Sequence, residues 1–283
     1  MTGGTGGTGH EVLANVRLAP NVHRMEVRAP RIARVHKAGQ FVIVRRGPGA
    51  ERIPLTVAAT DRGRGSITLI VQAVGKSTHE LVALAPGKRV NDVAGPMGRP
   101  FDMVVSGHAV CVGGGVGTAV VYPLARELVA GGARVTTIVG ARSGDRVLLE
   151  DELGALGPVM VYTDDGSRGH HGLVTAGLPH LLAVGDVELV YAAGPVRMMG
   201  AVAELTRPLG VRTIASLNPI MVDGTGMCGG CRVTVGGQMQ FACVDGPDFD
   251  GHSVDFDELA ERLSTYRDFE RRGLARLGGT CHE

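Results

Sequence analysis

Residues 109–119 have the sequence Ala-Val-Cys-Val-Gly-Gly-Gly-Val-Gly-Thr-Ala, in which an apolar run passes directly into four closely spaced glycines. The apolar run predicts a buried β-strand, and the residues after it, as far as Val129, have the pattern of a helix. The alternation continues, with strands predicted at residues 134–140, 159–163 and 187–193 and helices near 148–156, 173–182 and 196–209. It predicts a parallel α/β sheet with helices on both faces. Ligands of such sheets bind beyond the carboxyl ends of the strands.

The segment that precedes this sheet has a different pattern. Between Glu11 and about Ala94 the apolar residues form short runs rich in β-branched side chains, and Gly or Pro separates the runs. The clearest runs are residues 12–16, 25–27, 41–44, 55–59 and 67–74. Short strands at this spacing predict an antiparallel barrel or sandwich.

These changes of pattern divide the chain into four predicted segments. A Gly/Thr-rich flexible tail at residues 1–8 precedes a β domain at 9–103 and an α/β domain at 104–216. The last segment, residues 217–283, is rich in glycine and cysteine and ends in a charged amphipathic stretch, 255–277, which predicts a helix. That helix has two interpretations, a contact with a partner and an ordinary capping helix.

Composition excludes several classes of function. The net charge is +1, from 29 basic and 28 acidic residues, and aromatic residues make up 4% with no Trp, so neither nucleic acid nor a membrane surface is expected as a partner. No apolar run reaches the roughly 20 residues of a membrane span, and the N-terminus lacks the apolar run of a secretory signal, which predicts a cytoplasmic protein. Five cysteines, three of them within sixteen residues, do not fit a disulfide framework. Cys111 is expected in the core, and Cys281 has no predicted role.

Four residues near the C-terminus have the spacing of a metal centre. Asp223, Cys228, Cys231 and Cys243 form the plant-type [2Fe–2S] pattern C-x4-C-x2-C…C, with Asp in the first position. Three thiolates and one carboxylate supply four anionic ligands, and the glycines between them let the backbone curl around a cluster. The alternatives are a zinc site, which usually has a second close Cys pair, and inert thiols.

The glycine loop at residues 113–117 also has two interpretations. Bare amides at the start of a helix suit a pyrophosphate and predict a nucleotide site, but glycines there also allow a helix to pack closely on a strand. The loop is not the G-x-G-x-x-G fingerprint, because Thr118 takes the place of the last glycine. The second strand is followed by Arg142 rather than by the usual acid, so Arg142 is either a 2′-phosphate ligand or a surface residue.

Three further loops carry candidate cofactor contacts. Gly194-Pro195 begins a helix at the carboxyl end of a strand, where a nicotinamide can rest, although Pro is also an ordinary helix start. Asp164 follows another strand and can meet a ribose or form a turn. Residues 75–78, Gly-Lys-Ser-Thr, resemble the end of a P-loop, but Ile70 replaces its first glycine, so ATPase activity is not expected. The loop remains suited to a phosphate of another cofactor.

Together these parts resemble the ferredoxin–NADP reductase superfamily, in which a flavin barrel precedes a nicotinamide domain. The motifs at residues 52–56, 223–232 and 241–251 are similar to those of the small subunits of NADH-dependent ferredoxin:NADP oxidoreductases, also known as sulfide dehydrogenase small subunits. The resemblance covers about residues 10–270. The related electron-transfer subunit of dihydroorotate dehydrogenase uses four Cys ligands, so Asp223 argues against that alternative.

The resemblance implies three cofactors: FAD, a [2Fe–2S] cluster, and NAD(H) or NADP(H), with NAD(H) favoured by the family. The implied flavin contacts are Pro54, Leu55, Thr56, Ile70, Val71 and Gln72, with Gly75, Lys76, Ser77 and Thr78 at the FAD pyrophosphate. The implied nicotinamide-nucleotide contacts are Gly114, Gly115, Gly117, Thr118, Arg142, Asp164, Gly194 and Pro195. Arg52 lies one residue before the position of the family's flavin-motif arginine.

The implied function is that of an electron-transfer flavoprotein subunit. Electrons pass between the nicotinamide, FAD and the cluster to a larger flavin and iron–sulfur subunit related to the small subunit of glutamate synthase, and ferredoxin is reached indirectly. No catalytic side chain is expected, because the cofactors carry the chemistry. The alternatives are an electron-transfer subunit of dihydroorotate dehydrogenase and a zinc-stabilised binding module without redox activity.

Overall fold

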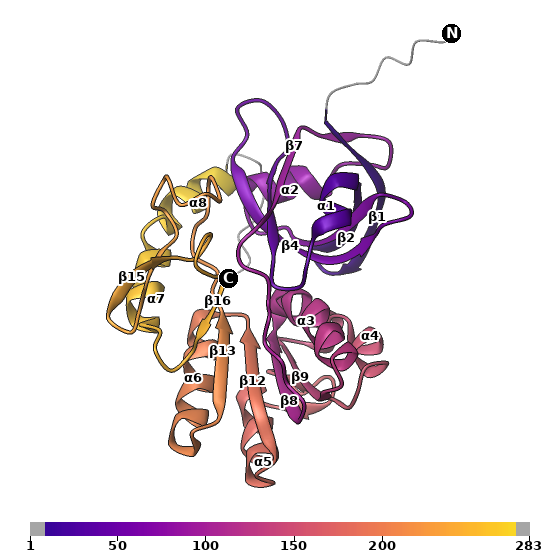
Figure 1. Cartoon of the computed structure of the whole chain (residues 1–283). Coiled ribbons are helices and arrows are strands. Elements are labelled where there is room, and N and C mark those ends of the chain that lie inside the picture. The colour runs from indigo at the N-terminus through magenta and orange to yellow at the C-terminus, as the bar shows by residue number, and fades with distance from the viewer. Residues whose placement is uncertain (1–8, 276–283) are drawn as a thin grey trace.

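The structure is a computed structural model that describes residues 9–275 of the 283-residue chain. The predicted flexible tail at residues 1–8 and Cys281 lie outside the described residues. Figure 1 shows an antiparallel barrel above an α/β sheet, with the C-terminal segment beside both. The predicted order of barrel, α/β domain and cysteine-bearing segment is confirmed.

The N-terminal domain is a nearly closed antiparallel barrel. Its sheet has the order β6-β1-β2-β5-β4-β3-β7. The two end strands, β6 and β7, follow each other in the chain with only Asn91 between them, so the sheet curls until its ends meet. The strands are β1 (His10–Ala19), β2 (Val22–Arg28), β3 (Phe41–Arg45), β4 (Arg52–Asp61), β5 (Ser66–Gln72), β6 (Arg89–Val90) and β7 (Asp92–Met97), with helices α1 (Pro30–Val35) and α2 (Lys76–Val82).

Alternating side chains fill the barrel. Val12 of β1, Met25 and Val27 of β2, and Ile67 and Leu69 of β5 are at most 1% exposed and belong to one cluster. Residues two apart on a strand face the same side, which explains why the short alternating runs in the sequence predict this domain.

The second domain is the predicted parallel sheet. Its order is β11-β10-β9-β8-β12-β13-β16, and all neighbouring pairs are parallel except the last. Its strands are β8 (His108–Gly114), β9 (Arg134–Ala141), β10 (Val159–Thr163), β11 (His170–His171), β12 (Val187–Ala193), β13 (Arg212–Ser216) and β16 (Asp248–Asp250). Its helices are α3 (Thr118–Ala130), α4 (Glu150–Gly154), α5 (Leu178–Ala183) and α6 (Val196–Thr206), preceded or followed by the 3-10 turns η1 (Gly115–Gly117), η2 (Gly144–Arg146), η3 (Val174–Gly177) and η4 (Arg207–Leu209). Helices α3 and α4 cover one face, and α5 and α6 cover the other.

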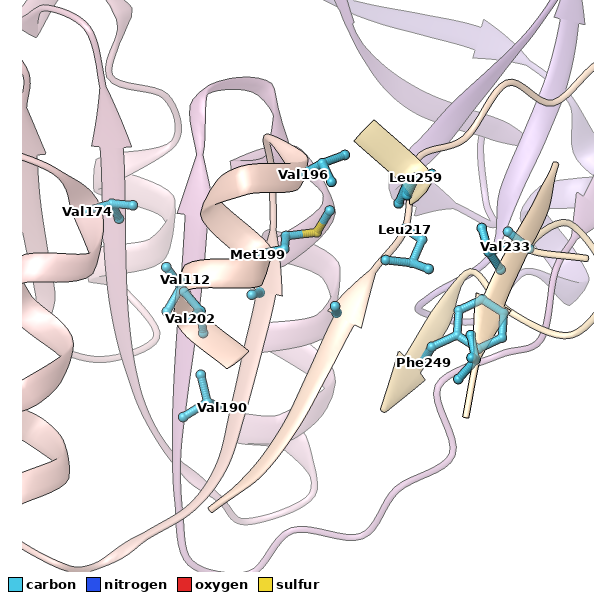
Figure 2. Close-up of a cluster of buried hydrophobic side chains, with 14 of the residues drawn as sticks. Val112, Val174, Val190, Val196, Met199, Val202, Leu217, Val233, Phe249 and Leu259 are labelled. Carbon is cyan, nitrogen blue, oxygen red and sulfur yellow. The ribbon is translucent and has the colours of Figure 1, made fainter. Parts of the chain in front are cut away.

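The C-terminal segment is not separate from this sheet. Strand β16 pairs antiparallel with β13, so residues of the cysteine-bearing segment form the edge of the α/β sheet. Figure 2 shows the consequence: Val190 and Met199 of the α/β domain and Val233, Phe249 and Leu259 of the C-terminal segment belong to one buried cluster. This shared core holds the segment against the domain.

The charged C-terminal stretch forms two helices rather than the single one predicted. Helix α7 (Phe256–Ser264) ends before Thr265, and α8 (Arg267–Ala275) begins two residues later. The halves pack on different partners: α7 buries Leu259 in the shared core, whereas α8 has no buried residue and lies against α2 of the barrel. The chain therefore turns between them. Among residues 9–275, no helix is both long and apolar enough to cross a membrane.

Candidate cofactor and electron-transfer sites

A β-hairpin brings two of the predicted cluster ligands together. Strands β14 (Arg232–Val235) and β15 (Gln238–Phe241) pair antiparallel and are joined by Gly236 and Gly237, both with positive φ (59° and 72°), as a tight two-residue turn requires. Arg232 faces Phe241, and just outside the hairpin the Ala242 N–H donates to Cys231 O (3.1 Å), which brings the next residue, Cys243, close to Cys231. Their Sγ atoms lie 3.1 Å apart without a disulfide, and both residues are at most 2% exposed. The alternating residues around Gly236-Gly237 are a hairpin signal in the sequence.

The other two predicted ligands are joined through the backbone. The Asp223 carboxylate accepts hydrogen bonds from the N–H groups of Thr225 (2.9 Å) and Cys228 (2.8 Å). These bonds, the one from Thr225 foremost, lower the pKa of Asp223 and keep it anionic. Gly224, Gly226 and Gly229 have φ of 76°, 83° and 66°, so the loop curls in a way that L side chains resist. Cys228 is exposed.

The donor set fits a two-iron cluster better than a single metal ion. No group of three or more His, Cys, Asp or Glu side chains in the described part of the chain is close enough to share one ion. The predicted ligands instead form two pairs, Cys231 with Cys243 and Asp223 with Cys228, and a [2Fe–2S] centre needs two protein ligands for each iron. Burial, and then its neighbour Cys231, raises the pKa of Cys243 to about 12. Such a thiol becomes a thiolate only where a metal replaces its proton.

The cluster loop lies directly on the barrel. A Cβ at Gly224 would collide with the Met97 side chain of β7 and come 3.0 Å from Ile43 of β3, so only glycine lets the loop approach this closely. A cavity of about 350 Å³ separates Asp223 from the barrel residues Arg45, Arg52, Asp92, Ile43 and Ala94. Arg52 therefore lines a cavity shared with a predicted iron ligand.

The rim of the cluster loop is apolar and exposed. Met227 is 89% exposed, and Val222 and Val244 are each more than 40% exposed. These three side chains, which we call the cluster rim, flank Asp223, Cys228 and Cys243 in the chain.

The predicted nucleotide loop lies where the order of the parallel sheet changes direction. Strand β8 has β9 on one side and β12 on the other, and the loops that follow β8 and β12 leave the sheet together. A Cβ at Gly114 would lie 2.5 Å from Met198 Sδ and 2.9 Å from Pro195 Cδ. A Cβ at Gly194, whose φ is 154°, would lie 2.9 Å from Met198 Cε and 3.0 Å from Gly114 O. Such a switch point at the carboxyl ends of the strands is where α/β sheets bind ligands.

The glycine loop at residues 113–117 had two interpretations, close packing of a helix on a strand and binding of a nucleotide, and its glycines differ in which one they fit. A Cβ at Gly117 would collide with Ala193 O and lie 2.5 Å from Ala193 C, so this glycine serves close packing of α3 on β12. At Gly115, whose φ is 55°, a Cβ would meet nothing within 4 Å, so packing does not require this glycine. Thr118 is fully buried, and its Oγ1 has no hydrogen-bond partner among the described residues.

Arg142 and Asp164 lie at the ends of neighbouring strands, β9 and β10. Both residues are exposed, and the Asp164 N–H donates to Ala141 O (3.0 Å). Beside them lies a depression of about 530 Å³, lined by Ser143, Gly144, Asp145, Asp165, Ser167 and Arg168. The hydroxyl and N–H of Ser167 donate to Asp165 and lower its pKa, so this carboxylate is anionic at neutral pH.

The predicted flavin contacts lie on adjacent strands of the barrel. Pro54, Leu55 and Thr56 are half-buried on β4, and Ile70 and Gln72 lie on the neighbouring strand β5. Val71, in contrast, is fully buried in the barrel core, so only its backbone faces outward.

Residues 75–78 begin helix α2. Thr78 Oγ1 accepts hydrogen bonds from the N–H groups of Val74 (3.0 Å) and Gly75 (2.9 Å), so Thr78 caps the helix. Ser77 donates to Glu51, and Lys76 is exposed. Gly75 faces open space and leaves this end of the helix accessible.

Comparison with known proteins identifies the family. Residues 218–255 match the family described as the iron–sulfur cluster binding domain of dihydroorotate dehydrogenase B. The whole chain is 43% identical over 279 residues to a homologue of the electron-transfer subunit of dihydroorotate dehydrogenase B (NAD(+)) from Thermotoga maritima, covering 98% of this chain and 99% of that protein. The chain belongs to this family of electron-transfer subunits. The corresponding subunit of Desulforamulus reducens is 34% identical over 253 residues, or 86% of this chain and 96% of that protein.

Solved structures agree with this family and its fold. A structure of NADH-dependent reduced ferredoxin–NADP oxidoreductase, from work on flavin-based electron bifurcation, superposes with a TM-score of 0.91 at 42% identity and covers 97% of this chain and all of that one. The ferredoxin reductase of carbazole 1,9a-dioxygenase superposes with a TM-score of 0.60 at 21% identity over 71% of this chain and 65% of that one, which shows the fold alone.

These findings confirm the predicted oxidoreductase function. This member of the family is an electron-transfer subunit with the fold of the ferredoxin reductases, and FAD, a [2Fe–2S] cluster and a nicotinamide nucleotide are its cofactors. The alternative of a zinc-stabilised module without redox activity is excluded by the iron–sulfur match. When bound, the flavin converts a hydride into single electrons and the cluster carries them one at a time. The chain's own residues hold and orient these groups.

Proposed function

We propose that this chain is the small subunit of a ferredoxin:NADP oxidoreductase-type complex, and that it accepts electrons from NADH and delivers them through its cluster to a larger flavin and iron–sulfur subunit. The proposed partner is related to the small subunit of glutamate synthase. Asp223, Cys228, Cys231 and Cys243 hold the cluster in this proposal. The flavin lies along β4 and β5, and the nicotinamide nucleotide lies at the glycine loops after β8 and β12. The protein is proposed to be cytoplasmic.

The placement of the cluster loop carries the proposal. On one side, Gly224 packs against two barrel residues, Ile43 of β3 and Met97 of β7. Strand β3 lies between β7 and β4, the strand proposed to contact the flavin. On the other side, Cys228 and the cluster rim are exposed. A one-electron carrier that touches the flavin domain and also reaches the surface is suited to passing electrons out of the chain.

The exposed rim supports a protein as the next acceptor. Met227, Val222 and Val244 place apolar surface around the cluster loop, and apolar or Met-rich exposed patches are typical of protein contacts. The homologous structure at 42% identity is that of an NADH-dependent reduced ferredoxin–NADP oxidoreductase.

The carboxylates near β9 support NADH rather than NADPH as the donor. Asp145 and Asp165 line the depression beside Arg142, and hydrogen bonds from Ser167 keep Asp165 anionic. Two carboxylates at the end of the second strand repel a 2′-phosphate, whereas they can accept hydrogen bonds from ribose hydroxyls.

The test separates electron entry from electron exit. The purified chain with FAD and cluster should reduce artificial dyes with NADH, and ferredoxin-linked turnover should require the larger subunit. Met227→Glu should weaken association with that subunit at least tenfold while dye reduction and the EPR signal of the cluster persist. Val184→Glu is the matched control, because Val184 is 71% exposed at the end of α5, away from the cluster loop.

Two results would overturn the proposal. One is a natively purified homo-oligomer or monomer, seen by size-exclusion with light scattering, that has full ferredoxin-linked activity without a second subunit. The other is a protein that binds neither iron nor flavin after anaerobic purification.

A further inference from the structure

The three parts of the molecule meet at one buried carboxyl group, that of Asp248. This residue begins strand β16 and lies opposite Ser216 of β13. Its Oδ1 accepts a hydrogen bond from the hydroxyl of Tyr191 on β12 (2.8 Å). Its Oδ2 faces Gly39, the glycine before barrel strand β3, where a Cβ would lie 3.1 Å away. Asp248 therefore touches both the α/β domain and the barrel while belonging to the C-terminal segment.

The carboxyl group is enclosed although the residue as a whole is only half-buried. Oδ2 is inaccessible to solvent and has no hydrogen-bond partner among the described residues. Tyr191 is fully buried, Ser216 is 7% exposed, and the Phe101 ring stands edge-on to Tyr191 at 6.1 Å. An ionised carboxylate here lacks the solvation that it has in water.

Among residues 9–275, no cation contributes to the electrostatics of this carboxyl group. From β12 the carboxyl group faces Tyr191, from β13 it faces the Ser216 hydroxyl, and from the barrel it faces the backbone at Gly39. Burial raises the pKa of Tyr191, so its hydroxyl stays neutral, and burial raises the pKa of Cys111, on the strand beside it, to about 12.

Charged groups on the adjoining segments are at least partly exposed to solvent. Arg99 and Asp245 pair with each other at 3.5 Å, and Asp250 on the same strand is exposed. Burial raises the pKa of Asp248 itself to about 6, while hydrogen bonds from Ser216 and Tyr191 oppose the shift.

The position also links the two electron-carrying parts. Asp248 follows Cys243 by five residues, and the intervening Gly246 O accepts a hydrogen bond from the Arg99 N–H (2.7 Å) in the segment that leaves the barrel. On the barrel side, Phe41 lies two residues after Gly39 and pairs with Thr56 on the flavin strand β4. An electron added to the cluster or to the flavin makes the ionised form of this enclosed carboxyl group less favourable, because the protein interior screens charge weakly.

We propose that Asp248 is a proton carrier whose protonation is linked to reduction of the cluster. When one electron enters the cluster, one proton passes from water to Asp248 Oδ2 and converts the carboxylate into the carboxylic acid. Oxidation returns the proton, and no other bond forms or breaks. The electron comes from the reduced nicotinamide. By linkage, the free energy with which the electron on the cluster favours protonation of Asp248 equals the free energy with which protonated Asp248 favours reduction of the cluster. Protonation of Asp248 therefore raises the reduction potential of the cluster. The inference rests on the proposed cluster ligands.

The test is the midpoint potential of the cluster as a function of pH, measured by EPR-monitored titration of the intact holoprotein. In the wild type the potential should fall as pH rises from 5 to 8, with a slope that approaches about 59 mV per pH unit, the value for one proton per electron. Asp248→Asn keeps an acceptor for Tyr191 and should give a flat profile. Asp250→Asn, on the same strand but exposed, should keep the wild-type slope.

Two further readouts keep the inference testable if Asp248→Asn does not fold. Tyr191→Phe removes a hydrogen bond that favours the carboxylate, so the sloping region should move to higher pH. The reduced-minus-oxidised infrared difference spectrum of the wild type should contain a protonated carboxyl band. A flat wild-type profile, or a slope that survives in Asp248→Asn, would overturn the inference. An absent cluster signal would instead overturn the proposed function.

Discussion

Replacing Gly117 by alanine tests whether close packing of α3 on β12 builds the nucleotide loop. Gly117 has an ordinary helical φ of −59°, so alanine is not strained by its backbone conformation. Its Cβ, however, would collide with Ala193 O and lie 2.5 Å from Ala193 C and 2.7 Å from Gly194 Cα. All three atoms belong to the backbone of the β12 loop, so no flexible side chain can move aside.

The magnitude follows from this geometry. Overpacking in a well-packed core costs about 1–3 kcal/mol, and the upper end applies here because the backbone itself must shift. For a domain of this size each kcal/mol lowers the melting temperature by roughly 2–4 °C, so Gly117→Ala should lower it by about 6–12 °C. Displacing Gly194, which follows the strand end at the predicted nicotinamide site, should also weaken NADH binding.

The assay is thermal unfolding of the holoprotein together with an NADH titration followed by flavin reduction. Gly154→Ala is the matched control, since a Cβ there meets nothing within 4 Å and the residue lies in helix α4. It should be neutral or stabilising by up to about 1 kcal/mol. An unchanged melting temperature and NADH affinity in Gly117→Ala would refute the packing argument.

Three further predictions concern the cluster, the donor and the buried carboxyl group. Asp223→Ala should lose or loosen the cluster, whereas Asp223→Cys should keep it with an altered potential; EPR and iron content decide, and an Ala variant with an unchanged signal would exclude Asp223 as a ligand. Arg142→Ala should leave kcat/KM for NADH nearly unchanged, and wild-type dye-reduction rates tenfold higher with NADPH would reverse the proposed donor preference. Because burial raises the pKa of Asp248 from 3.8 to about 6, the folded protein binds its proton more tightly than the unfolded chain does and loses stability as pH rises between these values. Asp248→Asn should therefore gain about 2.5 kcal/mol relative to wild type between pH 4 and pH 7, as chemical denaturation at both pH values can show, and an equal difference at both would contradict the shift.

The periodic elements and the ligand spacing were accessible from the sequence. The runs at 109–112 and 187–193 are continuous apolar segments, and strands of a parallel sheet are buried on both faces, so the pattern predicts them directly. The spacing of Asp223, Cys228 and Cys231 places three predicted ligands within one short loop, where distance along the chain limits distance in space. Cys243 completes the known spacing of such a cluster.

What the sequence pattern did not reveal are contacts between distant elements. Strand β6 has only two residues, and β7 contains Gly95 and Pro96 and has no apolar run. Both become recognisable only as the ends that bring the barrel almost to closure. Strand β16 is three residues long, too short for a periodicity, and joins the α/β sheet because Phe249 fits the core shared with that domain. The single helix expected at 255–277 is divided because its two halves pack on different domains.

The sequence by itself therefore determined the order of the domains and the glycine loops, and it predicts the cluster ligands. All of these depend on turns and periods within a few residues, where local backbone preferences and side-chain alternation act. Tertiary structure alone decided that Cys231 meets Cys243, that Val71 points into the barrel, and that Asp248 lies enclosed between Tyr191, Ser216 and Gly39. These outcomes depend on which strand edges pair and which surfaces share a core, and that choice is made by the packing of the whole chain rather than by any segment of it.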